Sequence, residues 1–307
     1  MRRLSHTTAE TVGAAIERCA GAMRRARVHF GHGTDNARDE AAELVFYVAG
    51  LEHSRGSAAY CKPLTPRQRA RIDALLRRRI ERRIPLPYLT HRAFFAGLEL
   101  YVDERVLVPR SPIAELVQRR FKPWAGARVR RILDVGTGSG AIALACALAF
   151  PRARVDAVDV SRAALDVCRR NVRRLGLGKR VRVLESDYFA ALGDSRYDII
   201  VSNPPYVGRA ELRALPREYR HEPRLGLVSG VDGLDSVRAI FSGVPRHLAD
   251  DGLLVVEVGN TEQALLRAYP RMPFIWPEIA MGGGGVFVLP AAALKGNPGR
   301  RGRSRGT

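Results

Sequence analysis

The feature that most constrains how this chain can fold is a glycine-rich turn between a strand-forming segment and a helix-forming segment. The short run Arg131–Val135 (RILDV) is followed by Gly136–Gly140 (GTGSG), and then by an apolar segment from Ala141 to Phe150. A strand, a glycine turn and a helix open the nucleotide site of many α/β domains, because glycine permits a tight turn and a close approach of a ligand to the helix N-terminus. The stretch therefore predicts a ligand-binding turn.

Strand-like and helix-like segments alternate from about Ser111 to Pro290. This alternation implies a mostly parallel sheet that is covered by helices on both faces. Helices are expected over 163–175 and 262–269, among others. Strands are expected near 130–135, 154–160, 180–185, 197–203, 252–259, 273–279 and 285–289. We therefore expect an α/β fold with a Rossmann-like core.

Changes in composition divide the chain into four parts. The first reads as helical, with helices over about 8–28 and 37–49 and a third that starts at Thr65 and Pro66, a strong N-cap signal. The second is rich in aromatic and β-branched residues, which predicts a β-hairpin linker. The last is rich in glycine and arginine, which predicts a disordered basic tail. The predicted parts are a small N-terminal helical domain 1–83, the linker 84–110, the α/β domain 111–293 and the tail 294–307.

Two carboxylates at predicted strand ends favour S-adenosylmethionine over a nicotinamide cofactor. The glycine spacing alone is ambiguous, because it also fits the G-x-G-x-x-G/A pattern of dinucleotide enzymes. Asp134 stands just before the first glycine, where it would repel a pyrophosphate but accept hydrogen bonds from the ammonium of a methionine group. Asp159 ends the next run, 159 − 136 = 23 residues after Gly136, and suits the two ribose hydroxyls. The alternative for Asp159 is an ordinary capping residue of the helix that follows.

A stiff loop ends the apolar run 197–202: Asn203-Pro204-Pro205-Tyr206. Two consecutive prolines remove two backbone donors and fix φ, and each residue before a proline is pushed toward an extended conformation. The loop therefore offers acceptor oxygens and an aromatic ring to a flat, neutral NH2 group. A strand that simply ends in a proline turn is the alternative.

The loop and the turn together predict methyl transfer to a nitrogen. Hydrogen bonds to the Asn203 side-chain oxygen and to the Pro204 carbonyl would orient the NH2 group and strengthen as positive charge develops on its nitrogen. Tyr206 would pack against the amide plane. Asp187 and Tyr188 follow another predicted strand and would border the adenine of the cofactor, the alternative being a plain strand-end turn.

Composition indicates which classes of protein this chain can belong to. The four cysteines are scattered, which favours neither a disulfide framework nor a metal site. Neither a signal-peptide core nor an apolar run of about 18 residues is visible, so a cytoplasmic protein without membrane contact is expected. The formal net charge of +20 comes almost wholly from arginine. Solvated helix faces account for most of it, and a weak contact with RNA stays open.

Several motifs resemble the HemK/Prm family of protein-glutamine methyltransferases. Asn203–Tyr206 and Asp134–Gly140 are similar to motifs of the whole family. The segments that resemble its PrmB branch are Phe30–Asn36, Val106–Ile113, Glu218–Pro223 and Ser229–Leu234. The chain departs from the family at Met281–Phe287, where the usual Asn and Asp around the glycines are absent.

This resemblance covers nearly the whole chain except the tail. It implies a class I methyltransferase fold, S-adenosylmethionine without a metal, N(5)-methylation of a glutamine in ribosomal protein uL3, and selection of that protein by the helical domain. By the same resemblance, Asn203 to Tyr206 match the loop that binds the substrate amide. The residues that match cofactor positions are Gly136, Thr137, Gly138, Ser139, Gly140, Asp159, Tyr188 and Asn203.

Three other functions remain open from the sequence. An adenine N(6)-methyltransferase would use the same loop on an exocyclic base amine, although the chain shows no separate target-recognition domain. A non-catalytic RNA-binding factor for ribosome assembly would retain the fold without the reaction. A nicotinamide dehydrogenase would use the glycine turn alone.

Overall fold

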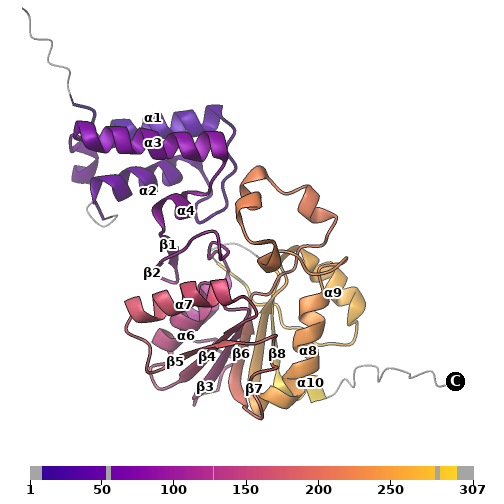
Figure 1. Cartoon of the computed structure of the whole chain (residues 1–307). Coiled ribbons are helices and arrows are strands. Elements are labelled where there is room, and N and C mark those ends of the chain that lie inside the picture. The colour runs from indigo at the N-terminus through magenta and orange to yellow at the C-terminus, as the bar shows by residue number, and fades with distance from the viewer. Residues whose placement is uncertain (1–8, 53–56, 127, 281–283, 296–307) are drawn as a thin grey trace, which may run out of the picture. The chain divides into compact units, whose positions relative to one another are not determined.

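A computed structural model describes residues 9–52, 57–126, 128–280 and 284–295 of the 307-residue chain (Figure 1). The chain forms two compact units. The first contains Met1–Arg92 and also Pro216–His221, and the second contains Ala93–Leu215 and Glu222–Thr307. The tail predicted over 294–307 lies outside the described residues from residue 296 onward.

The first unit is helical, and side-chain caps fix where its three longer helices begin. Thr11 accepts a hydrogen bond from the Ala14 N–H and starts the first helix, which therefore begins later than expected. Thr65 and Gln68 form a capping box at the start of the third, as Thr65 and Pro66 predicted. The helices are α1 (Val12–Arg25), α2 (Ala37–Ala49), α3 (Pro66–Arg82) and α4 (Leu86–Thr90).

The apolar faces of these helices form one core. Ile16, Cys19 and Met23 of α1 are buried against Leu44 of α2 and Ile72 of α3. Burying side chains of this size stabilises the fold by about 1.5–3 kcal/mol each. The first unit thus has a hydrophobic core of its own.

The hairpin expected in the linker is present but shorter than expected. Strands β1 (Ala93–Phe95) and β2 (Leu98–Leu100) pair antiparallel, and the turn between them has positive φ at Ala96 and Gly97. The region of Tyr88, expected in the β segment, is instead helix α4. Proline is favourable in the first turn of a helix, where the N–H has no intrahelical partner, and Pro87 lies there.

The second unit contains a six-stranded sheet of order β5-β4-β3-β6-β7-β8, in which β8 is antiparallel to β7 and the other neighbouring pairs are parallel (Figure 1). The fold class expected from the sequence is confirmed. The strands are β3 (Arg131–Val135), β4 (Arg154–Asp159), β5 (Val181–Glu185), β6 (Tyr197–Ser202), β7 (Leu248–Glu257) and β8 (Val286–Pro290).

Helices pack on both faces of this sheet. Ile132 and alternate strand residues face one core with α5 (Ile113–Gln118), α6 (Ala141–Ala149) and part of α7 (Arg162–Arg174). Leu133, one position further, faces the other core with α8 (Asp235–His247) and α9 (Glu262–Ala268). Successive side chains of a strand point to opposite faces, so a short apolar run is buried on both sides.

The strand expected near 273–279 is wrong. Only an isolated bridge joins Ile275 to Val288 of β8. Pro273 and Pro277 flank this position, and proline cannot donate to a sheet ladder. Phe274 and Trp276 instead pack their rings against Phe287. Among the described helices of both units, none is long and apolar enough to cross a membrane.

Candidate functional site

The glycine turn and the proline loop leave the sheet side by side. In the parallel pair β3–β6, Val135 lies opposite Ser202, and the Ser202 hydroxyl donates to the Val135 carbonyl over 2.7 Å. Gly136 directly follows β3 and Asn203 directly follows β6, so the glycine turn and the proline loop start at the same edge of the sheet. The order of strands reverses here, since β4 lies on one side of β3 and β6 on the other, and open α/β sheets bind ligands at such a point.

The glycine turn is open to a ligand on one side and tightly packed at its end. Gly136, Gly138 and Gly140 have φ of 72°, 55° and 84°, a region that glycine adopts without strain. A Cβ on Gly136 or Gly138 would meet nothing within 4 Å, whereas one on Gly140 would lie 2.7 Å from Cys168 Sγ. The first two glycines therefore leave room for a bound group, and the third lets α7 pack against the turn.

Asp134 is a buried carboxylate with one oxygen left over. Its Oδ2 accepts hydrogen bonds from Thr137 Oγ1 (2.6 Å) and from the Ala143 N–H (3.0 Å). Its Oδ1 is buried and has no hydrogen-bond partner among the described residues. Burial raises the pKa of Asp134 to about 7, and the nearby Asp159 carboxylate adds to the rise. A cationic group at Oδ1 would satisfy this oxygen and favour the ionised form.

Asp159 ends β4 beside the same turn. Its Oδ2 accepts from the Gly138 N–H and its Oδ1 from the Ser161 N–H, both over 2.9 Å. Burial raises the pKa of Asp159, while these backbone hydrogen bonds lower it. The cap of α7 is Ser161 itself, whose side chain accepts from the Ala164 N–H, so Asp159 is not the capping residue that was the alternative. The contact with Gly138 ties the carboxylate to the turn. Each oxygen keeps a further lone pair for a ligand.

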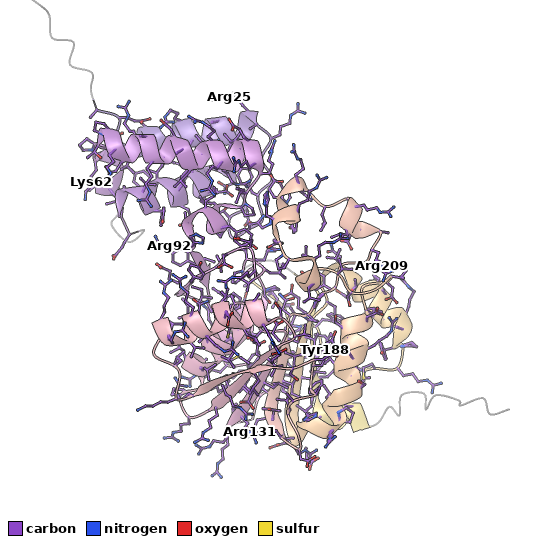
Figure 2. The ribbon with its side chains drawn as sticks, in the orientation of Figure 1. Arg25, Lys62, Arg92, Arg131, Tyr188 and Arg209 are labelled. Atoms are coloured by element: carbon purple, nitrogen blue, oxygen red, sulfur yellow. The ribbon has the colours of Figure 1, made fainter. Side chains whose placement is uncertain are left out.

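Asp187 and Tyr188 follow β5, the neighbour of β4 (Figure 2 labels Tyr188). The Ser186 N–H donates to the Asp159 carbonyl over 3.0 Å, which brings this turn to the end of β4. Tyr188 is half-buried with φ of 46°, an unusual conformation for a non-glycine residue. Asp187 is exposed. The turn expected as the alternative is therefore present, at the same sheet edge as the other residues.

Asn203 is half-buried, and its side chain makes no hydrogen bond to any other residue that the structure describes. Tyr206, three residues later, is held from two directions. Its hydroxyl donates to Glu257 Oε1 over 3.1 Å. Its ring packs on Gly259, where a Cβ would lie 2.6 Å from Tyr206 Cε2. The ring position is thus fixed, and the Asn203 amide has no hydrogen-bond partner among the described residues.

The segment in which this chain departs from the HemK/Prm pattern is only partly described. Residues 281–283 lie outside the described residues. The carbonyl of Gly285 accepts hydrogen bonds from the Val258 and Gly259 N–H groups over 2.6 and 3.3 Å. Gly285 therefore helps to hold the backbone on which the Tyr206 ring packs.

Comparison with known proteins decides the family. Residues 22–90 match the model of the PrmC N-terminal domain, and residues 116–215 match the Methyltransferase small domain. The ribosomal protein uL3 glutamine methyltransferase of Xanthomonas campestris pv. campestris is 46% identical over 273 residues, 89% of this chain and 88% of that one. The chain belongs to this family of glutamine methyltransferases. The resemblance drawn from the motifs is confirmed.

Other relatives agree with this family. The enzyme of the same name from Bordetella pertussis is 43% identical over 282 residues, which are 91% of this chain and 95% of that one. Among solved structures, the catalytic domain of hMettl16 superposes with a TM-score of 0.50 at 17% identity, over 73% of this chain and 81% of that chain. At this identity the match supports the methyltransferase fold alone.

One polar residue of this methyltransferase site, Glu257, is not apparent from its motifs. Glu257, at the carboxyl end of β7, is buried and accepts hydrogen bonds from Tyr206 and from the Ser111 hydroxyl. Burial raises the pKa of Glu257 to about 7, against the opposing effect of its hydrogen bonds from Ser111 and Tyr206. The sequence signal that could have identified Glu257 is an acidic residue near the end of a predicted strand, as for Asp159.

Arg110 and Glu222 form an ion pair in the same unit. The Arg110 guanidinium contacts both carboxylate oxygens of Glu222, over 2.5 and 2.6 Å, and the Val108 N–H donates to the same carboxylate over 3.1 Å. Bidentate pairs of this kind are stronger and more directional than single contacts. In the described part of the chain, no three His, Cys, Asp or Glu side chains are grouped so that they could hold a metal ion.

Proposed function

We propose that this chain transfers a methyl group from S-adenosylmethionine to the side-chain amide nitrogen of a glutamine in ribosomal protein uL3. One observation carries the proposal: the Asn203 amide is left without a hydrogen bond to the described residues, directly beside the glycine turn that follows β3. The names of the two relatives, each aligned over about nine-tenths of this chain, supply the substrate.

The residues of the turn fit the cofactor. The free Oδ1 of Asp134 suits the ammonium of its methionine group, and the open side of Gly136 and Gly138 suits a ligand close to the backbone. Asp159 would accept from the ribose hydroxyls, with Asp187 and Tyr188 beside the adenine. The remaining residues proposed to line this site are Thr137, Ser139 and Gly140. When bound, the methylsulfonium group supplies a methyl group that is already activated.

The protein's part in the reaction is then to orient the amide. The Asn203 side-chain oxygen and the Pro204 carbonyl accept from the two N–H groups of the glutamine amide, which raises electron density on its nitrogen and points it at the methyl carbon. These bonds strengthen as positive charge develops on nitrogen. Tyr206, fixed by Glu257, packs against the amide plane, and Pro205 keeps the loop stiff. Orientation of this kind is worth roughly 7–11 kcal/mol in favourable cases.

The other parts of the chain take supporting roles in this proposal. The helical domain 1–83 selects the substrate protein, the segment 84–110 links it to the α/β domain 111–293, and methyl transfer takes place in the latter. Because the substrate is a ribosomal protein, the reaction belongs in the cytoplasm. The methyl donor and the uL3 glutamine are both required, and a metal is not.

Incubation of the purified chain with radiolabelled S-adenosylmethionine and purified uL3 tests this function. We expect label in uL3, and loss of that label with Asn203→Ala. The adenine of DNA and RNA is the competing acceptor, because the same loop suits its amine. Labelled adenine beside unlabelled uL3 would overturn the proposal in favour of nucleic-acid methylation. Growth-supporting activity of Asn203→Ala without any mark would favour a non-catalytic assembly factor.

A further inference from the structure

Six exposed arginines lie around one end of the helical unit, which we call the arginine face: Arg24, Arg25, Arg27, Arg82, Arg217 and Arg220. Helices α1 and α3 run side by side in the same direction. Near their starts the Leu64 N–H donates to the Glu10 carbonyl over 2.8 Å. Beyond their last turns, Arg83 donates to the carbonyls of Ala26 and Arg27 over 2.7 and 2.9 Å. The arginines that end the two helices are therefore neighbours.

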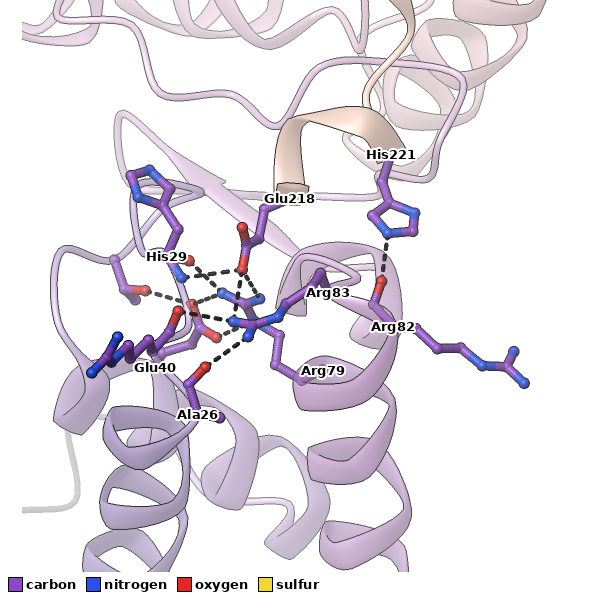
Figure 3. Close-up of polar contacts among 10 residues, drawn as sticks. Ala26, His29, Glu40, Arg79, Arg82, Arg83, Glu218 and His221 are labelled. Carbon is purple, nitrogen blue, oxygen red and sulfur yellow. Dashed lines mark hydrogen bonds and ion pairs between the residues drawn. The ribbon is translucent and has the colours of Figure 1, made fainter. Parts of the chain in front are cut away.

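The short helix η4 (Arg217–His221) carries the last two arginines. Figure 3 shows its residues Glu218 and His221 beside the end of α3. Glu218 accepts from the His29 N–H over 3.1 Å and lies 3.4 Å from Arg79 Nη1. His221 Nε2 lies 2.8 Å from the Arg82 carbonyl. Arg217 and Arg220 flank Glu218 in sequence and are exposed, so they extend the surface that Arg82 begins.

The positive charge of this face is not neutralised within the described parts of the chain. None of its six guanidiniums forms an ion pair with a described residue. Toward the start of α1 the situation is different, since Arg18 is paired with Glu10 and Asp73 over 2.7 Å each. Figure 3 shows the Arg82 guanidinium pointing away from the buried polar cluster.

Two buried carboxylates at this end of the unit are already engaged. Glu40 and Glu218 are buried and paired with Arg79, whose side chain has no exposed surface. Against the six arginines, the last turn of α3 carries one exposed carboxylate, Glu81.

Helix dipoles do not account for the face. Basic side chains in the last turn of a helix gain about 0.3–1 kcal/mol each from the dipole, which suffices for Arg24, Arg25 and Arg82. Arg27 lies beyond the end of α1, and Arg217 and Arg220 lie outside both helices. Unpaired like charges gathered on one surface repel one another, so an anionic partner would relieve a cost that the free protein carries.

We propose that the arginine face binds the phosphate backbone of RNA. A guanidinium presents a planar fork of donors that matches phosphate oxygens, and it remains charged at every physiological pH. RNA is favoured over an acidic protein because, and here the inference rests on the proposed function, the substrate is a ribosomal protein, which is itself a partner of RNA. The contact is with the backbone, so it does not depend on base sequence.

The test compares two triple variants of the full chain with equal loss of charge. The first changes the face (Arg82→Gln, Arg217→Gln, Arg220→Gln). The control changes exposed arginines of the second unit that are ion-paired with acids (Arg162→Gln, Arg169→Gln, Arg246→Gln). Binding of a short fluorescent single-stranded RNA is measured by anisotropy as a function of salt. Circular dichroism and S-adenosylmethionine binding report whether each variant is folded.

Each lost phosphate contact makes the negative slope of log K, the RNA association constant, against log salt shallower by about 0.7 for single-stranded RNA. Three lost contacts make the slope shallower by about 2. The ratio of the wild-type affinity to that of the variant with the changed arginine face should therefore shrink by about 20-fold between about 50 and 200 mM salt. The control variant should keep the wild-type slope. Equal slopes in the two variants, or polyglutamate competing as well as RNA, would overturn the proposal. Methyl transfer to RNA-free uL3 by the wild type is measured separately, so failure of the proposed function is distinguishable.

Discussion

Replacing Asp134 by asparagine should stabilise the free protein while abolishing cofactor binding. The pKa of this buried carboxyl is raised from 3.8 to about 7. Above pH 7 the folded protein must hold it ionised, which costs (7 − 3.8) × 1.36, or about 4 kcal/mol, relative to the unfolded chain. Because the folded pKa is the higher one, this cost grows as pH rises from about 4 to 7 and is then constant.

Asparagine removes the ionisation cost but introduces another. Its carbonyl oxygen still accepts from Thr137 and Ala143, whereas its NH2 group is placed where Asp134 Oδ1 has no described partner. A buried donor without a partner costs about 1–3 kcal/mol. The net expectation at pH 8 is a gain of about 1–3 kcal/mol in the free energy of unfolding, and little gain at pH 5. Cofactor binding should be lost at both pH values, because a neutral amide cannot pair with the ammonium.

Chemical unfolding at pH 5 and 8, with and without S-adenosylmethionine, measures both effects. Asp156→Asn is the matched control, since this carboxylate on the neighbouring strand is paired with Arg182 over 2.7 Å and accepts from the Tyr197 hydroxyl. That variant should lose stability and still bind the cofactor. An Asp134→Asn protein that is less stable at pH 8 than wild type, or that binds S-adenosylmethionine normally, would refute the reasoning.

Three further predictions concern Glu257, Gly259 and Arg79. The raised pKa of Glu257 makes the folded state hold one proton more than the unfolded state between about pH 4.5 and 7, so the free energy of unfolding falls over this range. Glu257→Gln should make that fall less steep by about 1.4 kcal/mol per pH unit. An unchanged pH profile of denaturant unfolding would contradict this. Gly259→Ala should reduce kcat for methyl transfer about 100-fold through displacement of Tyr206, with cofactor affinity unchanged in calorimetry. Arg79→Ala should cost about 3–5 kcal/mol in denaturant unfolding, since it leaves Glu40 buried without its main cation.

Much of the site follows from contiguous motifs. Asp134 and the glycines that follow it lie in one short stretch, as does the loop from Asn203 to Tyr206, so their local shapes depend on neighbouring residues. Parallel strands bring their carboxyl ends to a common edge, and Asp159 could be placed there without coordinates. The alternation of strands and helices was sufficient for that step. The roles of these residues remain predictions.

The supporting contacts are not predictable in this way. Glu257 is 51 residues from Tyr206, and Glu218 is 139 residues from Arg79, with no pattern in the sequence to pair them. For the same reason, the membership of Pro216–His221 in the helical unit is visible only in the structure. Long-range pairs of buried polar groups are chosen by the packed fold, since each group needs a partner once it is out of water.

The most direct test of the central claim is tandem mass spectrometry of uL3 after reaction with the wild-type chain or with Asn203→Ala. The account predicts a single methyl group on a glutamine side-chain nitrogen with the wild type. With Asn203→Ala it predicts a rate at least about 100-fold lower, the scale for loss of one group that stabilises a transition state, and cofactor affinity within about tenfold of wild type. A methyl group on another residue type, or an undiminished rate with Asn203→Ala, would contradict the account.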